Sequence, residues 1–306
     1  MKYSMCLPVD QVDPPAEFCS GEAVMEIARA AEAAGFSAVH ATEHPFPSRV
    51  GADMGGHHAL DPLVCMAFVA AATQSLRLHF NAFIPPYRNP FLGAKSLGDL
   101  DVMSGGRVIA GVAPGYLAGE FAALGVPLED RGPLLDEALV AWKAAWTGEP
   151  VTMESARWSA SNNVMLPRPV QRPHPPIWIG GNSKAALRRV AEHAQGWMPF
   201  PAKPNEATAV RTASITSIDD LAARVAILRR ALDELGRSDP IDICMTPFTH
   251  QHHPRGQENY DPPVLLDEAE KLAAIGVTWL SVKLRSPDRA TLLDYIERFG
   301  KDVIAC

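Results

Sequence analysis

An alternation of short apolar segments with longer helix-like segments runs along almost the whole chain and constrains the fold more than any other feature. Strands separated by helices pair in parallel and are joined by right-handed crossovers. Eight strand–helix pairs in 306 residues therefore predict an α/β fold, a closed (β/α)8 TIM barrel. The expected strands are 2–9, 38–44, 76–84, 107–115, 176–181, 196–200, 241–248 and 279–284. The expected helices are 21–35, 62–74, 90–104, 134–148, 184–193, 218–236, 263–276 and 288–300.

A doubly wound open sheet is the alternative architecture. Such a sheet normally carries a GxGxxG turn after its first strand, and "CLPVDQ" has no such turn. No domain boundary is visible, so a single domain over residues 1–306 is expected. Long connections at 45–62, 116–133, 201–217 and 249–263 follow strands, which predicts insertions at the C-terminal face, where barrel active sites are built. The segment 149–176 reads as a small hairpin or loop.

Composition excludes several classes of function. The net charge of −7 argues against nucleic acid as the main partner, because phosphate binding needs a basic excess. No apolar run is long enough to span a membrane, and the N-terminal segment, broken at Pro8 and Asp10, does not read as a signal peptide. Five cysteines without a CxxC pair fit a reducing compartment. A cytoplasmic enzyme is therefore expected.

Polar residues follow the second strand. The segment "ATEHPF" places Glu43 and His44 at the expected strand end, where alternation points only one of the two into the barrel mouth. His44 can act as an acid, a base or a hydrogen-bond donor near neutral pH. The alternative is a histidine that bonds a backbone carbonyl. The position at a strand end favours the functional interpretation.

The next two strands end in small or polar residues. Asn81 and Ala82 stand where an apolar barrel strand usually has Val or Ile, which indicates close approach by a planar ligand. Gly115 permits a tight turn after the fourth strand, and Tyr116 offers a hydroxyl and a stacking face. An ordinary barrel layer of mixed side-chain sizes would also account for these residues.

The strongest local signal is "IGGNSKAA". A strand runs through Gly180 and Gly181 into Asn182, and a helix then starts with Ser183 as its cap and Lys184 in its first turn. Helix N-termini favour negative charge, yet no acid is present in this turn. The absence of an acid predicts that the phosphate of a ligand supplies the negative charge at this helix start. A plain turn with a serine cap is the alternative.

Several loop histidines raise the question of a metal. Imidazole nitrogens bind zinc, but no acid accompanies them at a recognised ligand spacing. No metal site is therefore expected, and a metal-dependent barrel hydrolase is a minor alternative. These residues are His57, His58, His250, His252 and His253.

Longer motifs resemble the bacterial luciferase-like superfamily of flavin and deazaflavin barrels. The resemblance is clearest in "ATEHPF", in "DVMSGGRVIAGVAPGY" followed by "EFAALGV", and in "RPVQRPHPPIWIGG". Its nearest branch looks like the group that uses coenzyme F420. The resemblance implies a homodimer, a cofactor ring at the barrel mouth with its phosphate at "GGNS", and a non-proline cis peptide near Asn81-Ala82. It also implies that Lys184, Arg188 or Arg189 helps to bind an acidic cofactor tail.

One difference from the family limits which activity can be transferred to this chain. Deazaflavin sugar-phosphate dehydrogenases place a carboxylate where this chain has Tyr116, so that activity is not expected. The end of the first strand, "CLPVD", offers no acid facing the ring. His44 and Tyr116 remain as the catalytic candidates.

The sequence thus predicts an oxidoreductase that transfers a hydride between coenzyme F420 and a small, largely apolar organic substrate. The first alternative is a two-component monooxygenase that uses FMN, because the two kinds of enzyme share a fold. The expected cofactor-binding residues are His44, Asn81, Ala82, Gly115, Tyr116, Gly180, Gly181, Asn182, Ser183 and Lys184. A non-catalytic flavin binder is the remaining possibility.

Overall fold

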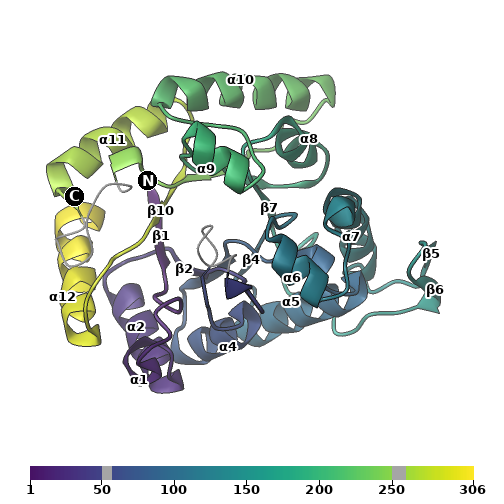
Figure 1. Cartoon of the computed structure of the whole chain (residues 1–306), viewed down its shortest axis with the longest axis horizontal. Helices are drawn as coiled ribbons and strands as arrows, with labels where there is room; N and C mark the ends of the chain where they lie inside the picture. The colour runs from purple at the N-terminus through teal and green to yellow at the C-terminus, as the bar shows by residue number, and fades with distance from the viewer. Residues whose placement is uncertain (50–56, 250–259) are drawn as a thin grey trace.

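The computed structural model describes residues 1–49, 57–249 and 260–306. Within these residues, parallel strands close into a barrel in the order β1-β10-β9-β8-β7-β4-β3-β2 (Figure 1). This order confirms the predicted (β/α)8 architecture. The barrel strands are β1 (Lys2–Cys6), β2 (Ala38–Ala41), β3 (Arg77–Phe80), β4 (Val108–Val112), β7 (Ile177–Gly180), β8 (Gly196–Met198), β9 (Asp242–Met245) and β10 (Trp279–Val282).

Helices surround the strands, and capping residues mark many of their ends. Ser20 accepts a hydrogen bond from the backbone of Ala23, and Gly105 ends a helix in the left-handed conformation, with φ of 72°. The large helices are α2 (Gly21–Ala33), α4 (Pro62–Ala72), α5 (Pro90–Ser104), α7 (Arg131–Ala145), α8 (Lys184–His193), α10 (Ile218–Glu234), α11 (Pro262–Ala274) and α12 (Arg289–Phe299). A short π-helical segment, Gly300–Ile304, follows the last of them.

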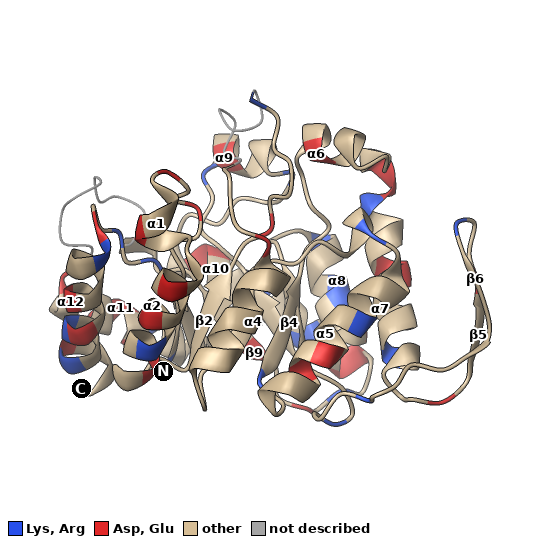
Figure 2. Cartoon of the chain, turned by 90° about the horizontal axis from the view of Figure 1, so that it is seen from below, with Lys and Arg blue, Asp and Glu red and all other residues tan. Residues whose placement is uncertain are grey.

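Shorter elements occupy the long connections. Figure 2 shows α6 and α9 on the edge of the barrel away from the N-terminus, which is the C-terminal end of the strands. The segment predicted as a hairpin or loop forms an antiparallel hairpin that projects from the barrel (Figure 1). These elements are α1 (Pro15–Phe18), η1 (Pro85–Tyr87), α6 (Ala118–Ala123), η2 (Leu128–Asp130), β5 (Val151–Glu154), β6 (Ser159–Asn163) and α9 (Pro204–Ala209).

Large side chains fill the barrel, and a layer of aliphatic residues joins the strands to the helices. Trp178 and Trp279 pack inside the barrel with ring centroids 5.3 Å apart. Gly111 is required between β3 and β4, because a Cβ there would lie 1.8 Å from the carbonyl oxygen of Phe80. The barrel is therefore a packed core that holds its loops at fixed positions.

The strand ends differ from the prediction. β2 ends at Ala41, so Glu43 and His44 lie in the loop beyond it rather than on the strand. Parallel pairing with β3 stops at the Ala41–Phe80 pair, and after this point the backbone is free to turn. No helix in the described part of the chain is long and apolar enough to cross a membrane.

Candidate active site

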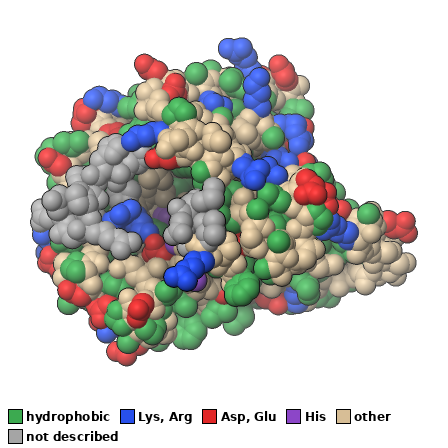
Figure 3. Space-filling view, in the orientation of Figure 1, with side chains coloured by type: hydrophobic (Ala, Val, Ile, Leu, Met, Phe, Trp, Pro, Cys, Tyr) green, Lys and Arg blue, Asp and Glu red, His purple; other side chains and the backbone are tan. Residues whose placement is uncertain are grey.

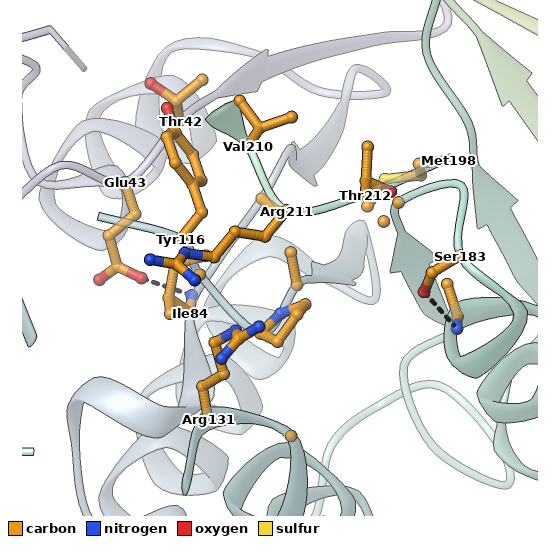
Figure 4. A pocket seen from close by; sticks show the side chains of 18 of the residues that line it. Thr42, Glu43, Ile84, Tyr116, Arg131, Ser183, Met198, Val210, Arg211 and Thr212 are labelled. Carbon is orange, nitrogen blue, oxygen red and sulfur yellow. Dashed lines mark hydrogen bonds between the residues drawn. The ribbon is translucent and has the colours of Figure 1, made fainter. Parts of the chain in front are cut away.

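A cavity of about 540 Å3 opens at the C-terminal end of the barrel (Figure 4). It lies beyond β2, β3, β4 and β7. The structure therefore brings together predicted residues that are far apart in the sequence. Those that line the cavity are His44, Asn81, Ala82, Gly115, Tyr116, Gly180, Gly181 and Ser183. Asn182 and Lys184 are not among its lining residues.

One end of the cavity is formed by the start of α8. The Ser183 hydroxyl accepts a hydrogen bond from the backbone nitrogen of Ala186 at 3.2 Å, and no acid stands in the first helical turn. Gly181 has φ of 106°, a conformation that favours glycine, and it turns the chain from β7 into the helix. This end therefore offers backbone N–H groups and the positive end of a helix dipole to an anion.

Asn182 is buried beside this helix start and bonds the neighbouring loops. Its side-chain nitrogen donates to the carbonyl oxygens of Phe200 and Ala213, and its side-chain oxygen accepts from the Phe200 nitrogen at 3.1 Å. These bonds satisfy the amide fully, so Asn182 holds the loop rather than facing the cavity. Lys184 is exposed to solvent.

Two arginines line the cavity, with their guanidinium groups on the side of Tyr116 and Ile84 rather than beside Ser183. Arg131 comes from the start of α7 and Arg211 from the loop after α9, and Figure 4 shows their side chains approaching one another. Among the described residues, no carboxylate forms an ion pair with either guanidinium group. Burial and the like charges of Arg211 and Arg189 lower the pKa of Arg131. An anion bound here would offset this repulsion.

The arginines named from the resemblance are placed differently. Arg189 lines the cavity, but its Nε donates to Asp136 at 2.6 Å. Arg188 is exposed and bonds Asp136 at 3.1 Å and also pairs with Glu192. Both of these arginines are already paired with acids.

His44 contacts a buried carboxylate. Its Nδ1 lies 3.3 Å from Oε2 of Glu120, which also accepts a hydrogen bond from the Tyr87 hydroxyl at 2.8 Å. The side chain of Glu120 is fully buried, and its second oxygen has no hydrogen-bond partner among the described residues. Burial, with the Glu120 bond, raises the pKa of Tyr87, so the phenol remains a donor. The carboxylate thus fixes one ring nitrogen of His44 and leaves the other available.

Aromatic residues surround the imidazole of His44. The ring centroid of Tyr116 is 6.0 Å away and that of His57 is 4.6 Å away, both edge-on. Burial and the charge of Glu120 raise the pKa of Tyr116 to about 12, so its hydroxyl stays protonated at neutral pH. Burial lowers the pKa of His57, which favours the neutral ring. A hydroxyl and two imidazoles therefore converge at this end of the cavity.

Glu43 positions the loop after β3. Its side chain accepts a hydrogen bond from the Ile84 nitrogen at 2.5 Å and forms an ion pair with Arg88. Burial raises its pKa, and the Arg88 charge opposes this effect. The same loop contains a cis peptide bond between Asn81 and Ala82, as the family resemblance implied.

No group of three or more His, Cys, Asp or Glu side chains suited to a metal ion occurs in residues 1–49, 57–249 and 260–306. His57 joins the cavity instead, while His58 is not among its lining residues. His250, His252 and His253 lie outside the described residues.

Comparison with known proteins assigns the family. The model for the luciferase-like monooxygenase family matches residues 1–251. The chain belongs to the luciferase-like monooxygenase family. An uncharacterized protein of Mycobacterium tuberculosis is 29% identical over 299 residues, covering 91% of this chain and 93% of that protein. The family assignment agrees with the observed (β/α)8 barrel.

Two further matches indicate the chemistry found among similar proteins. The FMNH2-dependent dimethylsulfone monooxygenase of Pseudomonas putida is 29% identical over 181 residues, 58% of this chain and 48% of that protein. The coenzyme F420-dependent tetrahydromethanopterin reductase of Methanopyrus kandleri has a TM-score of 0.74 at 18% identity, covering 99% of this chain and 98% of that one. Flavin and deazaflavin enzymes therefore both occur among its neighbours.

Sequence reasoning found no acid near the ring and missed the buried Glu120, which contacts His44, and the cavity-lining Arg131 and Arg211. Glu120 lies on α6, 76 residues after His44, so no local spacing connects the two. The "EF" of the family pattern was its only signal. Arg131 and Arg211 come from separate connections and had no local pattern.

Proposed function

We propose that this chain binds coenzyme F420 in the 540 Å3 cavity and transfers a hydride between the coenzyme and a small organic substrate. The observation that carries this proposal is the pair formed by Arg131 and Arg211, which lines the same cavity as the start of α8 and has no carboxylate partner among the described residues. A helix N-terminus is sufficient for one phosphate. Two further cations fit a cofactor whose tail carries both a phosphate and carboxylates.

Different residues along the cavity would then bind the cofactor and the substrate. Backbone N–H groups at Ser183 and Ala185 and the hydroxyl of Ser183 would bind the phosphate, and Asn81–Ala82 would lie against the ring. Bound F420 supplies the hydride carrier. His44, held through Nδ1 by Glu120, would present its other nitrogen to the substrate and give or take the proton. The Tyr116 hydroxyl would donate a hydrogen bond.

A two-component FMN monooxygenase is the second candidate, favoured by the relative from Pseudomonas putida. FMN carries a single terminal phosphate, which the start of α8 could bind alone. Under this alternative, Arg131 and Arg211 would contribute less to cofactor affinity than Ser183 does. The two candidates therefore differ in the expected effect of the arginines.

Fluorescence titration separates them. The protein is titrated with F420, with FMN and with the deazaflavin riboside that lacks phosphate and tail. We expect F420 to bind about tenfold or more tightly than the other two, since two charge contacts are lost with either. An Arg131→Gln/Arg211→Gln variant should remove most of this preference. Tighter binding of FMN, unaffected by that variant, would move the assignment to the monooxygenase.

We also propose that the chain forms a homodimer through α4 and α5. These adjacent helices expose large apolar side chains, which in a monomer would face water. Phe68 is 43% exposed on α4, and Met103 is 82% exposed on α5. The remaining large apolar side chains exposed on the two helices are Val64 and Leu92.

A further inference from the structure

A second cavity, of about 430 Å3, lies beside the first in the barrel mouth. Its lining comes from the ends of β1, β2, β9 and β10 and from the start of α9. Thr42 and Asn81 line both cavities, so the two meet at the Asn81–Ala82 bond. A molecule in the second cavity would therefore contact a cofactor ring placed at that bond.

Basic residues dominate the second cavity. Lys203, Lys283 and Arg285 line it, against one acid, Glu206, among the described lining residues. Asp10 forms an ion pair with Lys283, and basic side chains still outnumber acidic ones among the described residues here. The whole chain carries a net charge of −7, so this excess is opposite to the average composition. Figure 3 shows basic side chains at the edge of the hollow on this face.

Lys283 is fixed rather than freely mobile. Its backbone nitrogen donates to the Tyr260 hydroxyl at 3.0 Å, and its ammonium group pairs with Asp10. Burial alone would lower the pKa of Lys283, but its interactions with Cys6 and with the carboxylate of Asp10 more than offset this and raise it. The ammonium group therefore keeps its charge inside the cavity.

The floor of the second cavity is polar. The buried His40 lies there, with Nδ1 3.0 Å from the Ser4 hydroxyl and Nε2 3.3 Å from the Ser281 hydroxyl. This floor offers hydrogen-bonding groups and no negative charge. Basic side chains beside a polar, hydrogen-bonding floor suit a small organic molecule with one anionic end.

We propose that the second cavity is the substrate site and that it selects substrates carrying a carboxylate or phosphate group. The proposal rests on the proposed function, because it places the cofactor ring at Asn81–Ala82. It also changes the expectation of a largely apolar substrate. The anionic group would lie near Lys203, Lys283 and Arg285, and the reacting carbon would lie toward Asn81.

Matched small probes test this selection. Benzoate, phenyl phosphate and the neutral benzamide are titrated by calorimetry into the full-length protein, with and without F420. The variants are Lys203→Glu and Arg285→Glu, and the control is Arg230→Glu, a charge reversal at an exposed position on α10. Far-UV circular dichroism and F420 affinity are measured for each variant to check the fold and the first cavity.

We expect one or both anions to bind about tenfold more tightly than benzamide. Each variant in the cavity should lose about fivefold or more in anion affinity, while the control changes less than about twofold. The anion that binds more tightly shows whether the site prefers substrates with a carboxylate or with a phosphate. Equal binding of benzoate, phenyl phosphate and benzamide, or equal losses in the control, would overturn the proposal. If F420 fails to bind but the anions still depend on Arg285, the proposed function is wrong and the anion site stands.

Discussion

Replacing Ser183 by Asp tests the anion site at the start of α8 without disturbing the helix. Asp caps helices as well as Ser does, so the bond to the Ala186 nitrogen should be kept. The new carboxylate would lie about 4 Å from a bound phosphate, where repulsion is about 1 kcal/mol in water and about 4 kcal/mol at an effective dielectric constant of 20. Because Ser183 is half-buried, we expect a loss of about 1–3 kcal/mol, or about 5–150-fold in cofactor affinity.

The assay is fluorescence titration with F420 and with FMN at two salt concentrations. Ser183→Asn is the matched control, because it keeps a capping oxygen and adds no charge. Its affinity should fall less than that of the Asp variant, because the Asn side-chain amide adds no charge and can still donate a hydrogen bond to the phosphate. Higher salt should narrow the gap between the Asp and Asn variants. Equal affinities of the two variants, with melting temperatures unchanged, would refute an anion site at this helix.

Three further predictions concern the other end of the cavity and the outer surface. His44→Ala should lower turnover by about a hundredfold or more, with a smaller loss of cofactor affinity. Glu120→Gln should lower turnover by about tenfold, because the His44 ring loses its charged partner. Unchanged turnover in both variants would show that the two residues are structural. The pKa of Tyr116 is raised to about 12, so its contribution to stability is complete below about pH 10 and is lost as the pH rises through 12. Tyr116→Phe should therefore make the free energy of unfolding, measured by urea titration, fall less steeply at alkaline pH. An equal pH dependence of the unfolding free energy in parent and variant would contradict this. Phe68→Glu should convert the dimer into a monomer in analytical ultracentrifugation, whereas a monomeric parent protein would refute the dimer.

The fold was predictable because it depends on local patterns that repeat. The helix over 90–104 was expected at those bounds, and the Ser183 cap with its acid-free turn is present as predicted. Strand ends were less predictable, since β2 stops at Ala41 where its pairing with β3 stops. The end of β2 depends on its pairing with a neighbouring strand, so it cannot be predicted from the segment "ATEHPF" alone.

The polar contacts of the site were less predictable than its location. Asn182 sits in the predicted motif but turns toward the loops at Phe200 and Ala213, which only the folded chain brings close. Glu120 reaches His44 across 76 residues of sequence. Such contacts depend on which loops lie close together in the folded chain, and the hydrophobic periodicity of the sequence does not predict this.

A crystal structure of the protein with bound F420 tests the central claim most directly. The account predicts the ring against Asn81–Ala82, with a phosphate oxygen about 3 Å from the Ser183 hydroxyl and carboxylates of the tail at Arg131 and Arg211. The second cavity should remain open beside the ring. A cofactor bound elsewhere, or a phosphate that makes no contact with the start of α8, would contradict the account.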